Sequence, residues 1–430
     1  MYNSLEILER ICYNYSEGKD LTIYNLFSVD EFLNNLPIIH IGWNEQTVWR
    51  KIMLAIKNGK IILENSIEQG KVLLFTDKIE AIINENEIPE WIEIIDAEGG
   101  YISPGLIELH IHGYLGRDVC DASEESMRII SKGLLENGVT GYLPTTMTVD
   151  INTVQGAIDV CRALMKEENF DGSTILGVHA EGPFISASKK GAQDERYILK
   201  PDADFVKKNS DVIRVITLAP EEDGEGFPEI AKMAESGVVV SMGHTSADYE
   251  TAMASTKAGV KHSTHLFNAM TPMTHRAPGV VGAALASEVS CELIVDTYHV
   301  NAALFEMVYK LKGRKMCAIT DCLPAGGLPE GEYTLGGAKI IYRDNICRLE
   351  DGTIAGSVLR LNKGVWNIYK NSGIPLNECV NCASLNPATT LGIADKKGSI
   401  AVGKDADIVI LDNDFNVKKT IIGGKIKYEA

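Results

Sequence analysis

Six side chains that can bind a metal ion are spread along the chain, each where the sequence predicts the end of a β-strand. They are His110, His112, Glu181, His244, His265 and Asp321. Side chains alternate along a strand, so His110 and His112 should point to the same face. Neutral imidazoles with carboxylates suit zinc or ferrous iron, whereas magnesium and calcium prefer nearly all-oxygen ligands. The set therefore predicts a zinc or iron site, and the lack of thiolates argues against a closed structural one.

The His-x-His pair would be weak support on its own. Two buried strand histidines with hydrogen-bond partners inside the protein explain it equally well. The other positions favour the metal site, because Glu181, His244 and Asp321 each follow a short apolar run. Such runs are typical of a parallel sheet that is buried on both faces.

The elements that must position these residues alternate between apolar and amphipathic segments. This alternation predicts a (β/α)8 barrel, an α/β fold in which functional residues gather at the C-terminal ends of the strands. A doubly wound open sheet is less favoured, because no Gly-x-Gly-x-x-Gly follows a first strand. We expect strands near residues 105–112, 139–146, 174–181, 213–219, 237–244, 260–265, 291–296 and 315–321, and helices near 121–137, 150–167, 201–212, 226–236, 246–258 and 301–312.

Composition indicates a soluble cytoplasmic enzyme. The 430 residues, 45% of them hydrophobic, suffice for one large barrel and a smaller domain. No apolar stretch is long enough for a membrane helix, and the N-terminus does not resemble a signal peptide. Nine scattered cysteines fit a reducing compartment, and the pair Cys379 and Cys382 is interpreted as structural because it has no second pair. A net charge of -18 argues against nucleic acid and anionic membranes as partners.

Nine short motifs extend this interpretation to a family. In chain order they are Pro-Gly-Leu-Ile-Glu-Leu-His-Ile-His-Gly (104–113), His-Ala-Glu-Gly-Pro-Phe (179–184), Leu-Ala-Pro-Glu (218–221), Met-Gly-His-Thr (242–245), Thr-His-Leu-Phe-Asn-Ala-Met (264–270), His-Arg-Ala-Pro-Gly (275–279), Ile-Thr-Asp (319–321), Gly-Thr-Ile-Ala-Gly-Ser (352–357) and Lys-Gly-Ser-Ile-Ala-Val-Gly-Lys-Asp-Ala-Asp (397–407). Over residues 52–428 the chain resembles the amidohydrolase superfamily and, within it, the family of N-acetylglucosamine-6-phosphate deacetylases. One departure is Ala180, where the family usually has leucine, and it affects no catalytic group.

The resemblance implies three parts of the chain. Residues 52–103 and 398–430 would pair into one small β-sandwich domain, and residues 104–397 would form the barrel. Residues 1–51 precede every motif and form an N-terminal extension. Leu5, Leu8 and Ile11 have helical spacing, and a capping-box pattern spans residues 28–31, so we expect this extension to be helical.

The resemblance also assigns roles to residues. Glu181, His244 and His265 would hold one divalent metal, His110 and His112 a second, with Glu181 bridging; one or two zinc or iron ions per subunit are expected. Asp321 would be the general base and then the general acid, and is counted with the metal ligands. His179 is expected to support the ligands, and His40 and His262 to be structural. The expected substrate contacts are Ala192, Gln193, Asn268, Ala269, Arg276, His299, Ile354, Ala355 and Gly356.

The implied activity is metal-dependent hydrolysis of the acetamide of N-acetyl-D-glucosamine 6-phosphate, in amino-sugar catabolism. A deacetylase of the galactosamine epimer is the near alternative and a cyclic amidase the distant one. A metal-free regulator is disfavoured, because such a protein would lack some of the metal-binding residues of the family and all of them are present in this sequence. An acidic chain needs a local cationic pocket for this substrate, and we expect residues 264–279, which include Arg276 and no acid, to supply it. In the family this arginine reaches the neighbouring subunit, so a homodimer is expected.

Overall fold

The computed structural model describes residues 53–89 and 92–430. The helix and capping box that the sequence predicts before residue 52 lie outside the described residues. Residues 54–430 form one compact unit.

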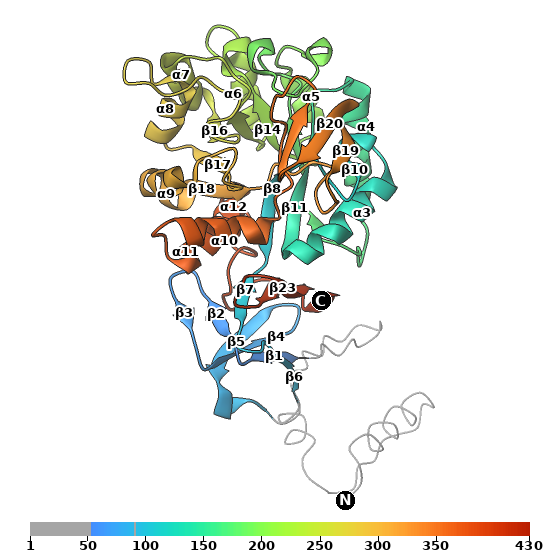
Figure 1. Ribbon diagram of the computed structural model, residues 1–430, viewed down its shortest axis with the longest axis vertical. Helices are drawn as coiled ribbons and strands as arrows, with labels where there is room; N and C mark the ends of the chain where they lie inside the picture. The colour runs from blue at the N-terminus through green and yellow to red at the C-terminus, as the bar shows by residue number, and fades with distance from the viewer. Residues whose placement is uncertain (1–52, 90–91) are drawn as a thin grey trace, which may run out of the picture. The chain divides into compact units, whose positions relative to one another are not determined.

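Eight parallel strands form a barrel in the described part of the chain (Figure 1). Hydrogen bonds just beyond the last strand complete the ring: the N–H of Asp321 donates to the carbonyl of His110 at 3.0 Å, and the N–H of His112 donates to that of Cys322 at 2.9 Å. The expected (β/α)8 architecture is confirmed. The strands are β8 (Leu106–Ile111), β11 (Val139–Thr146), β13 (Val178–Glu181), β14 (Ile213–Leu218), β15 (Val239–Met242), β16 (Val260–Ser263), β17 (Ser290–Ile294) and β18 (Met316–Ile319).

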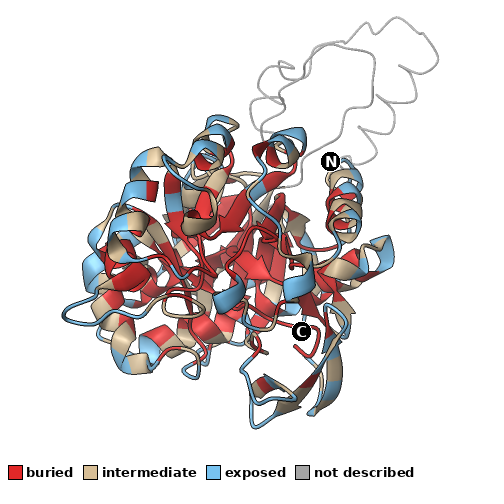
Figure 2. Ribbon diagram, turned by 90° about the horizontal axis from the view of Figure 1, so that it is seen from above, coloured by how far each residue is buried: buried red, intermediate tan, exposed pale blue. Residues whose placement is uncertain are grey.

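Helices surround this barrel, and Figure 2 shows buried residues in its middle and exposed residues on the outer helices and loops. Amphipathic spacing located α3 to α7 and α9 in the sequence, but α8, α10 and α12 were missed. All of α8 except its last residue is buried, so the segment lacks the polar face that helical periodicity needs. The helices are α3 (Glu124–Leu134), α4 (Ile151–Leu164), α5 (Ala203–Lys208), α6 (Pro228–Glu235), α7 (Tyr249–Ala258), α8 (Gly279–Ala286), α9 (Phe305–Lys312), α10 (Leu361–Asn371), α11 (Leu376–Asn381) and α12 (Leu385–Thr390).

Two further sheets face each other across a shared apolar core and form the small β-sandwich. Strand β7, from the first part of the chain, pairs antiparallel with β22 from the last part, with Ile102 opposite Ile410. The domain boundaries given above remain a prediction. One sheet has the order β5 (Ile79–Asn84), β4 (Lys71–Phe75), β1 (Leu54–Lys57), β6 (Glu93–Asp96); the other has β24 (Lys425–Glu429), β23 (Val417–Ile422), β22 (Ile408–Leu411), β7 (Tyr101–Pro104), β2 (Lys60–Ile62), β3 (Ile67–Glu68).

A three-stranded antiparallel sheet follows the last barrel strand, and the sequence analysis did not predict it. It consists of β19 (Gly331–Leu335), β20 (Ala338–Arg343) and β21 (Ile346–Leu349). Its apolar face packs on Met147, Leu323 and Ala355, which lie beside the C-terminal ends of the barrel strands. The insertion therefore forms one wall of the region where the candidate ligands lie. The shorter strands are β9 (Gly113–Tyr114), β10 (Arg117–Asp118) and β12 (Thr174–Ile175).

None of the described helices combines the length and apolar character that a membrane span requires. Cys379 and Cys382 lie in and just after α11, where both thiols are free and buried.

Candidate metal centre

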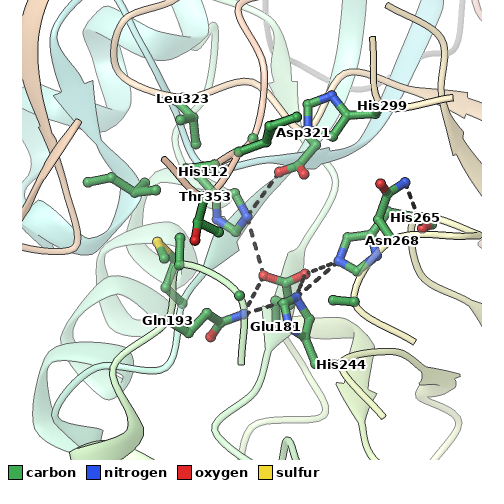
Figure 3. A pocket seen from close by; sticks show the side chains of 18 of the residues that line it. His112, Glu181, Gln193, His244, His265, Asn268, His299, Asp321, Leu323 and Thr353 are labelled. Atoms are coloured by element: carbon green, nitrogen blue, oxygen red, sulfur yellow. Dashed lines mark hydrogen bonds and ion pairs between the residues drawn. The ribbon is translucent and has the colours of Figure 1, made fainter. Parts of the chain in front are cut away.

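The barrel brings the six candidate ligands together at the C-terminal ends of its strands. Figure 3 labels five of them, all except His110. The ligand set combines four imidazoles with two carboxylates, and all six residues are buried. His110 lies in β8 with His112 directly after it, Glu181 ends β13, and His244, His265 and Asp321 each lie two residues beyond the end of β15, β16 and β18.

Glu181 lies between two groups of ligands. On one side its Oε1 is 3.2 Å from His244 Nε2 and 3.0 Å from His265 Nε2. On the other side Oε1 is 3.4 Å from His110 Nε2, and Oε2 is 3.4 Å from His112 Nε2.

Asp321 belongs to the group that contains His110 and His112. Its Oδ1 is 3.3 Å from His112 Nε2 and 3.7 Å from His110 Nε2. Two clusters of three ligands, His110 with His112 and Asp321, and Glu181 with His244 and His265, are therefore close enough to hold ions.

Hydrogen bonds behind the imidazoles fix which ring nitrogen faces the centre. The Nδ1 atoms of His110, His112 and His244 lie 2.9, 3.1 and 2.8 Å from Glu292 Oε2, Thr145 O and Lys189 O. These acceptors hold a proton on Nδ1, so Nε2 is the ring nitrogen that faces the centre and can bind a metal ion. His110 Nε2 and His112 Nε2 are only 3.2 Å apart, close enough for both to bind one cation. The donor set therefore fits a divalent metal ion.

The electrostatics of the centre favour the ionised form of its two carboxyl groups. Burial alone would raise the pKa of Glu181, but His244 and His110 lower it well below its usual range. Burial likewise opposes ionisation of Asp321, and His110 with His112 still lowers the pKa of its carboxyl. Both residues are therefore carboxylates, which can bind a cation or accept a proton.

The imidazoles respond to the same field in opposite ways. Burial works against a charged His265, but the hydrogen bond from this ring to Glu181 raises its pKa to about 9. His179 lies beneath the centre, where burial and the nearby His110 lower its pKa to about 3. Its ring contacts Leu109 O at 3.0 Å and Thr217 Oγ1 at 2.7 Å, so it supports neighbouring strands as a neutral group.

Three of the ligands have a left-handed backbone. The φ angles of His244, His265 and Asp321 are 47°, 30° and 51°. Non-glycine residues rarely adopt this region, and each instance costs of the order of 1 kcal/mol or more. The conformation turns the chain beyond the end of each strand. The side chains of His244 and His265 then contact Glu181, and that of Asp321 contacts His112.

A pocket of about 360 Å³ opens beside the centre. Every expected site residue lines it except two: the buried His110, and Arg276, which lies in an exposed segment. The expected residues in its wall are His112, Glu181, Ala192, Gln193, His244, His265, Asn268, Ala269, His299, Asp321, Ile354, Ala355 and Gly356; the others are Met147, Ser188, Lys189, Gly191, Tyr298, Leu323, Leu335 and Thr353.

Gln193 does more than line the pocket. Its Nε2 donates to Glu181 Oε2 at 2.8 Å, and its Oε1 accepts the N–H of Thr148 at 2.6 Å. The contact with Thr148 fixes the amide orientation, so the N–H group faces the carboxylate. Gln193 therefore holds the acid that lies between the two groups of ligands.

Glu292, in β17, is a buried residue of this site that the sequence analysis missed. Its Oε2 accepts from His110 Nδ1 at 2.9 Å and from the N–H of His265 at 3.2 Å, and its Oε1 is 3.2 Å from His262 Nε2. Burial would raise its pKa, but His110 and then His262 lower the pKa well below the usual range. The signal in the sequence was an acidic residue inside an otherwise apolar strand, Cys-Glu-Leu-Ile-Val.

A barrel with imidazole and carboxylate ligands at its strand ends defines a class of metal-dependent hydrolases. A sequence profile described as "Amidohydrolase family" matches residues 101–427, and the chain belongs to this family. It is similar to the N-acetylglucosamine-6-phosphate deacetylase of Bacillus subtilis, at 38% identity over 385 residues that cover 87% of this chain and 97% of that protein.

Solved structures agree with this relationship. The N-acetylglucosamine-6-phosphate deacetylase of Pasteurella multocida aligns with a TM-score of 0.83 and 35% identity, covering 88% of this chain and all of that one. A mutant of the Mycobacterium smegmatis enzyme, solved in complex with N-acetyl-D-glucosamine-6-phosphate, aligns with a TM-score of 0.80 and 26% identity over 87% of this chain and 99% of that one. The family expected from the motifs is confirmed.

Proposed function

We propose that this chain hydrolyses the acetamide of N-acetyl-D-glucosamine 6-phosphate to D-glucosamine 6-phosphate and acetate, in amino-sugar catabolism. The observation that carries the proposal is the complete ligand set beside the pocket, in a chain that aligns over nearly the full length of relatives with that name. A cytoplasmic location remains a prediction from the sequence.

One or two divalent ions, zinc or iron, would be held by the two ligand groups. Glu181, His244 and His265 would hold the first ion, and His110 with His112 a second that shares Glu181. A bound ion supplies Lewis acidity and lowers the pKa of a water molecule from about 16 towards 7.

Asp321 would move the proton in both halves of the reaction. Its carboxylate Oδ1 takes a proton from the attacking water as the C–O bond forms at the acetamide carbon. The same group then gives that proton to the sugar nitrogen as the C–N bond breaks. Acetic acid, which ionises to acetate, leaves with the free amine, and Asp321 returns to its starting state. The lowered pKa of its carboxyl is consistent with a group that starts as the base.

The pocket would orient the sugar phosphate. His299, Ala192, Gln193, Ile354, Ala355 and Gly356 would surround the sugar, and Asn268 and Ala269 would contact the phosphate. Arg276 does not line the pocket of its own chain. We therefore propose a homodimer in which Arg276 of the partner subunit binds the phosphate bidentately. This arginine would supply the local positive charge that a phosphate needs on a chain with a net charge of -18.

Acetate release tests this function directly. The zinc-loaded protein is assayed with the 6-phosphates of N-acetylglucosamine and N-acetylgalactosamine and with both unphosphorylated sugars. We expect the highest kcat/KM for N-acetylglucosamine 6-phosphate. Preference for the galactosamine epimer would replace the assigned substrate, and absence of acetate release from all four sugars would refute the deacetylase function.

A further inference from the structure

A tight turn follows β17 and contains Asp296, Thr297, Tyr298 and His299. Oδ1 of Asp296 accepts the N–H groups of Tyr298 and His299, both at 2.9 Å. Thr297 has a φ of 72°, so the turn passes through the left-handed region. Oδ2 of the same carboxylate is 2.7 Å from Nδ1 of His299. One acid therefore shapes the turn with one oxygen and contacts the imidazole with the other.

This arrangement determines which ring nitrogen of His299 is free. The side chains of Asp296 and His299 are only 7% and 9% exposed, so water competes little for their hydrogen bond. His299 lines the pocket, and its Nε2 has no hydrogen-bond partner among the described residues. Since a carboxylate can only accept, Nδ1 must carry the proton, and Nε2 is the atom available to a ligand.

We propose that Asp296 is a positioning residue for the reaction, because it holds His299 in the Nδ1-protonated form and so presents Nε2 to the substrate. The proposal rests on the function proposed above, in which His299 contacts the sugar. The simpler alternative is that Asp296 only stabilises the turn. The two roles use different oxygens of one carboxylate, so a substitution can separate them.

Asp296→Asn makes this separation. The asparagine Oδ1 can still accept both backbone N–H groups, which preserves the turn. Its amide NH2 takes the place of Oδ2 and is a donor, so His299 can keep a hydrogen bond only by moving its proton from Nδ1 to Nε2. We expect a reversed imidazole tautomer and a fall in kcat/KM of about 10-fold to 100-fold, the range typical of removing the partner that orients a metal-bound histidine.

The matched control is Asp202→Asn. Asp202 accepts the N–H groups two and three residues ahead, as Asp296 does, but it caps α5 outside the pocket. This variant should keep the kcat/KM of the parent. Metal content and thermal unfolding of all variants are measured first, so that a loss of zinc or of folding is not mistaken for a loss of positioning.

The experiment combines spectroscopy with a double-mutant cycle. Nitrogen-15 NMR of the zinc-loaded protein, labelled on histidine, reports the tautomer, and His299→Gln assigns the signal. In the parent we expect Nδ1–H, and in Asp296→Asn we expect Nε2–H. In the His299→Gln background, Asp296→Asn should lower kcat/KM by less than about 3-fold, because the imidazole through which Asp296 acts is no longer present.

Several outcomes would overturn the proposal. If NMR finds the proton of His299 on Nε2 in the parent protein, that result alone overturns the proposal. An equal loss of kcat/KM from Asp296→Asn in both backgrounds would assign Asp296 to the turn alone, and a parent-like kcat/KM would remove its role in the reaction. If the parent released no acetate from any sugar, the proposed function would fail, while the NMR measurement would still decide whether Asp296 sets the tautomer.

Discussion

Glu292 offers the sharpest test of how the barrel holds its ligands. Glu292→Leu replaces the buried carboxylate with an apolar side chain and leaves three hydrogen-bonding groups without an acceptor: His110 Nδ1, His262 Nε2 and the N–H of His265. An unsatisfied buried donor costs about 1–3 kcal/mol, so the change should lower the free energy of unfolding by about 3–9 kcal/mol. A protein is typically stable by only about 5–15 kcal/mol, so this loss would be a large fraction of the total.

Glu292→Gln should be much milder. The glutamine Oε1 can replace Oε2 as the acceptor for His110 and for the N–H of His265. Its NH2 then faces His262 Nε2, which can accept if the His262 proton moves to Nδ1, 2.6 Å from Ser290 Oγ. Every group keeps a partner while the negative charge is removed. We expect a loss of unfolding free energy of at most about 2 kcal/mol.

Urea unfolding of the metal-free proteins measures these differences without a contribution from bound metal. Zinc titration then tests the ligands: in Glu292→Leu, His110 loses its orienting acceptor, so its metal position should weaken about 10-fold to 100-fold. Glu108→Gln is the control, because Glu108 is an equally buried glutamate that accepts from the N–H groups of His110 and Thr320 and from no imidazole in the described chain. A loss below about 1 kcal/mol in Glu292→Leu, or equal losses in the Leu and Gln variants, would refute this reasoning.

Three further predictions concern the proposed chemistry. Asp321→Asn keeps the shape of the side chain but removes the proton acceptor, so kcat should fall by about 10²-fold to 10⁴-fold while KM changes little. A near-normal kcat would assign the proton transfer to another group. Metal analysis should find one to two equivalents of zinc or iron in the parent. His110→Asn should lose metal from one position, whereas His244→Asn should abolish activity. A metal-free but active protein would contradict the assignment of both ligand groups. Arg276→Ala should lower kcat/KM for the phosphorylated sugar by about 10-fold to 100-fold, the loss of one charge-assisted contact, and leave the unphosphorylated sugar nearly unchanged. Mixing Arg276→Ala with Asp321→Asn subunits should restore activity if the site is shared, because one site of each hybrid dimer then has both Asp321 and the partner's Arg276. If the subunits exchange and no activity returns, Arg276 does not act in the partner's site.

The barrel and the convergence of its candidate ligands were predictable because each depends on local pattern. Apolar runs located the strands, and polar residues at the end of a strand in an α/β barrel meet at one face, so Glu181 and Asp321 could be placed together from spacing alone. The helix α8 was not predictable in this way, since its segment is apolar on all sides. The sheet β19–β21 was missed as well, because a short surface insertion leaves no long periodic pattern.

The residues that support the site were harder to predict than the ligands. Glu292 and His110 are far apart in sequence, and their contact depends on the order in which strands close the barrel. Asp296 is near His299 in sequence, yet only the left-handed turn at Thr297 shows that its carboxylate meets the ring. The sequence therefore shows which chemical groups a site can contain, whereas the residues that contact each group are known only from the tertiary structure.

The pairing of β7 with β22 has a consequence for the order in which the protein is made. Ile102 and Ile410 lie opposite each other, although they are about three hundred residues apart in the chain. On the ribosome, β7 emerges long before its partner, so one of its edges stays unpaired while the whole barrel is synthesised. Closing so distant a pair is intrinsically slow. The small domain is thus completed last, and a nascent chain that stops before β22 leaves both the beginning of this domain and its apolar core exposed to aggregation and proteolysis.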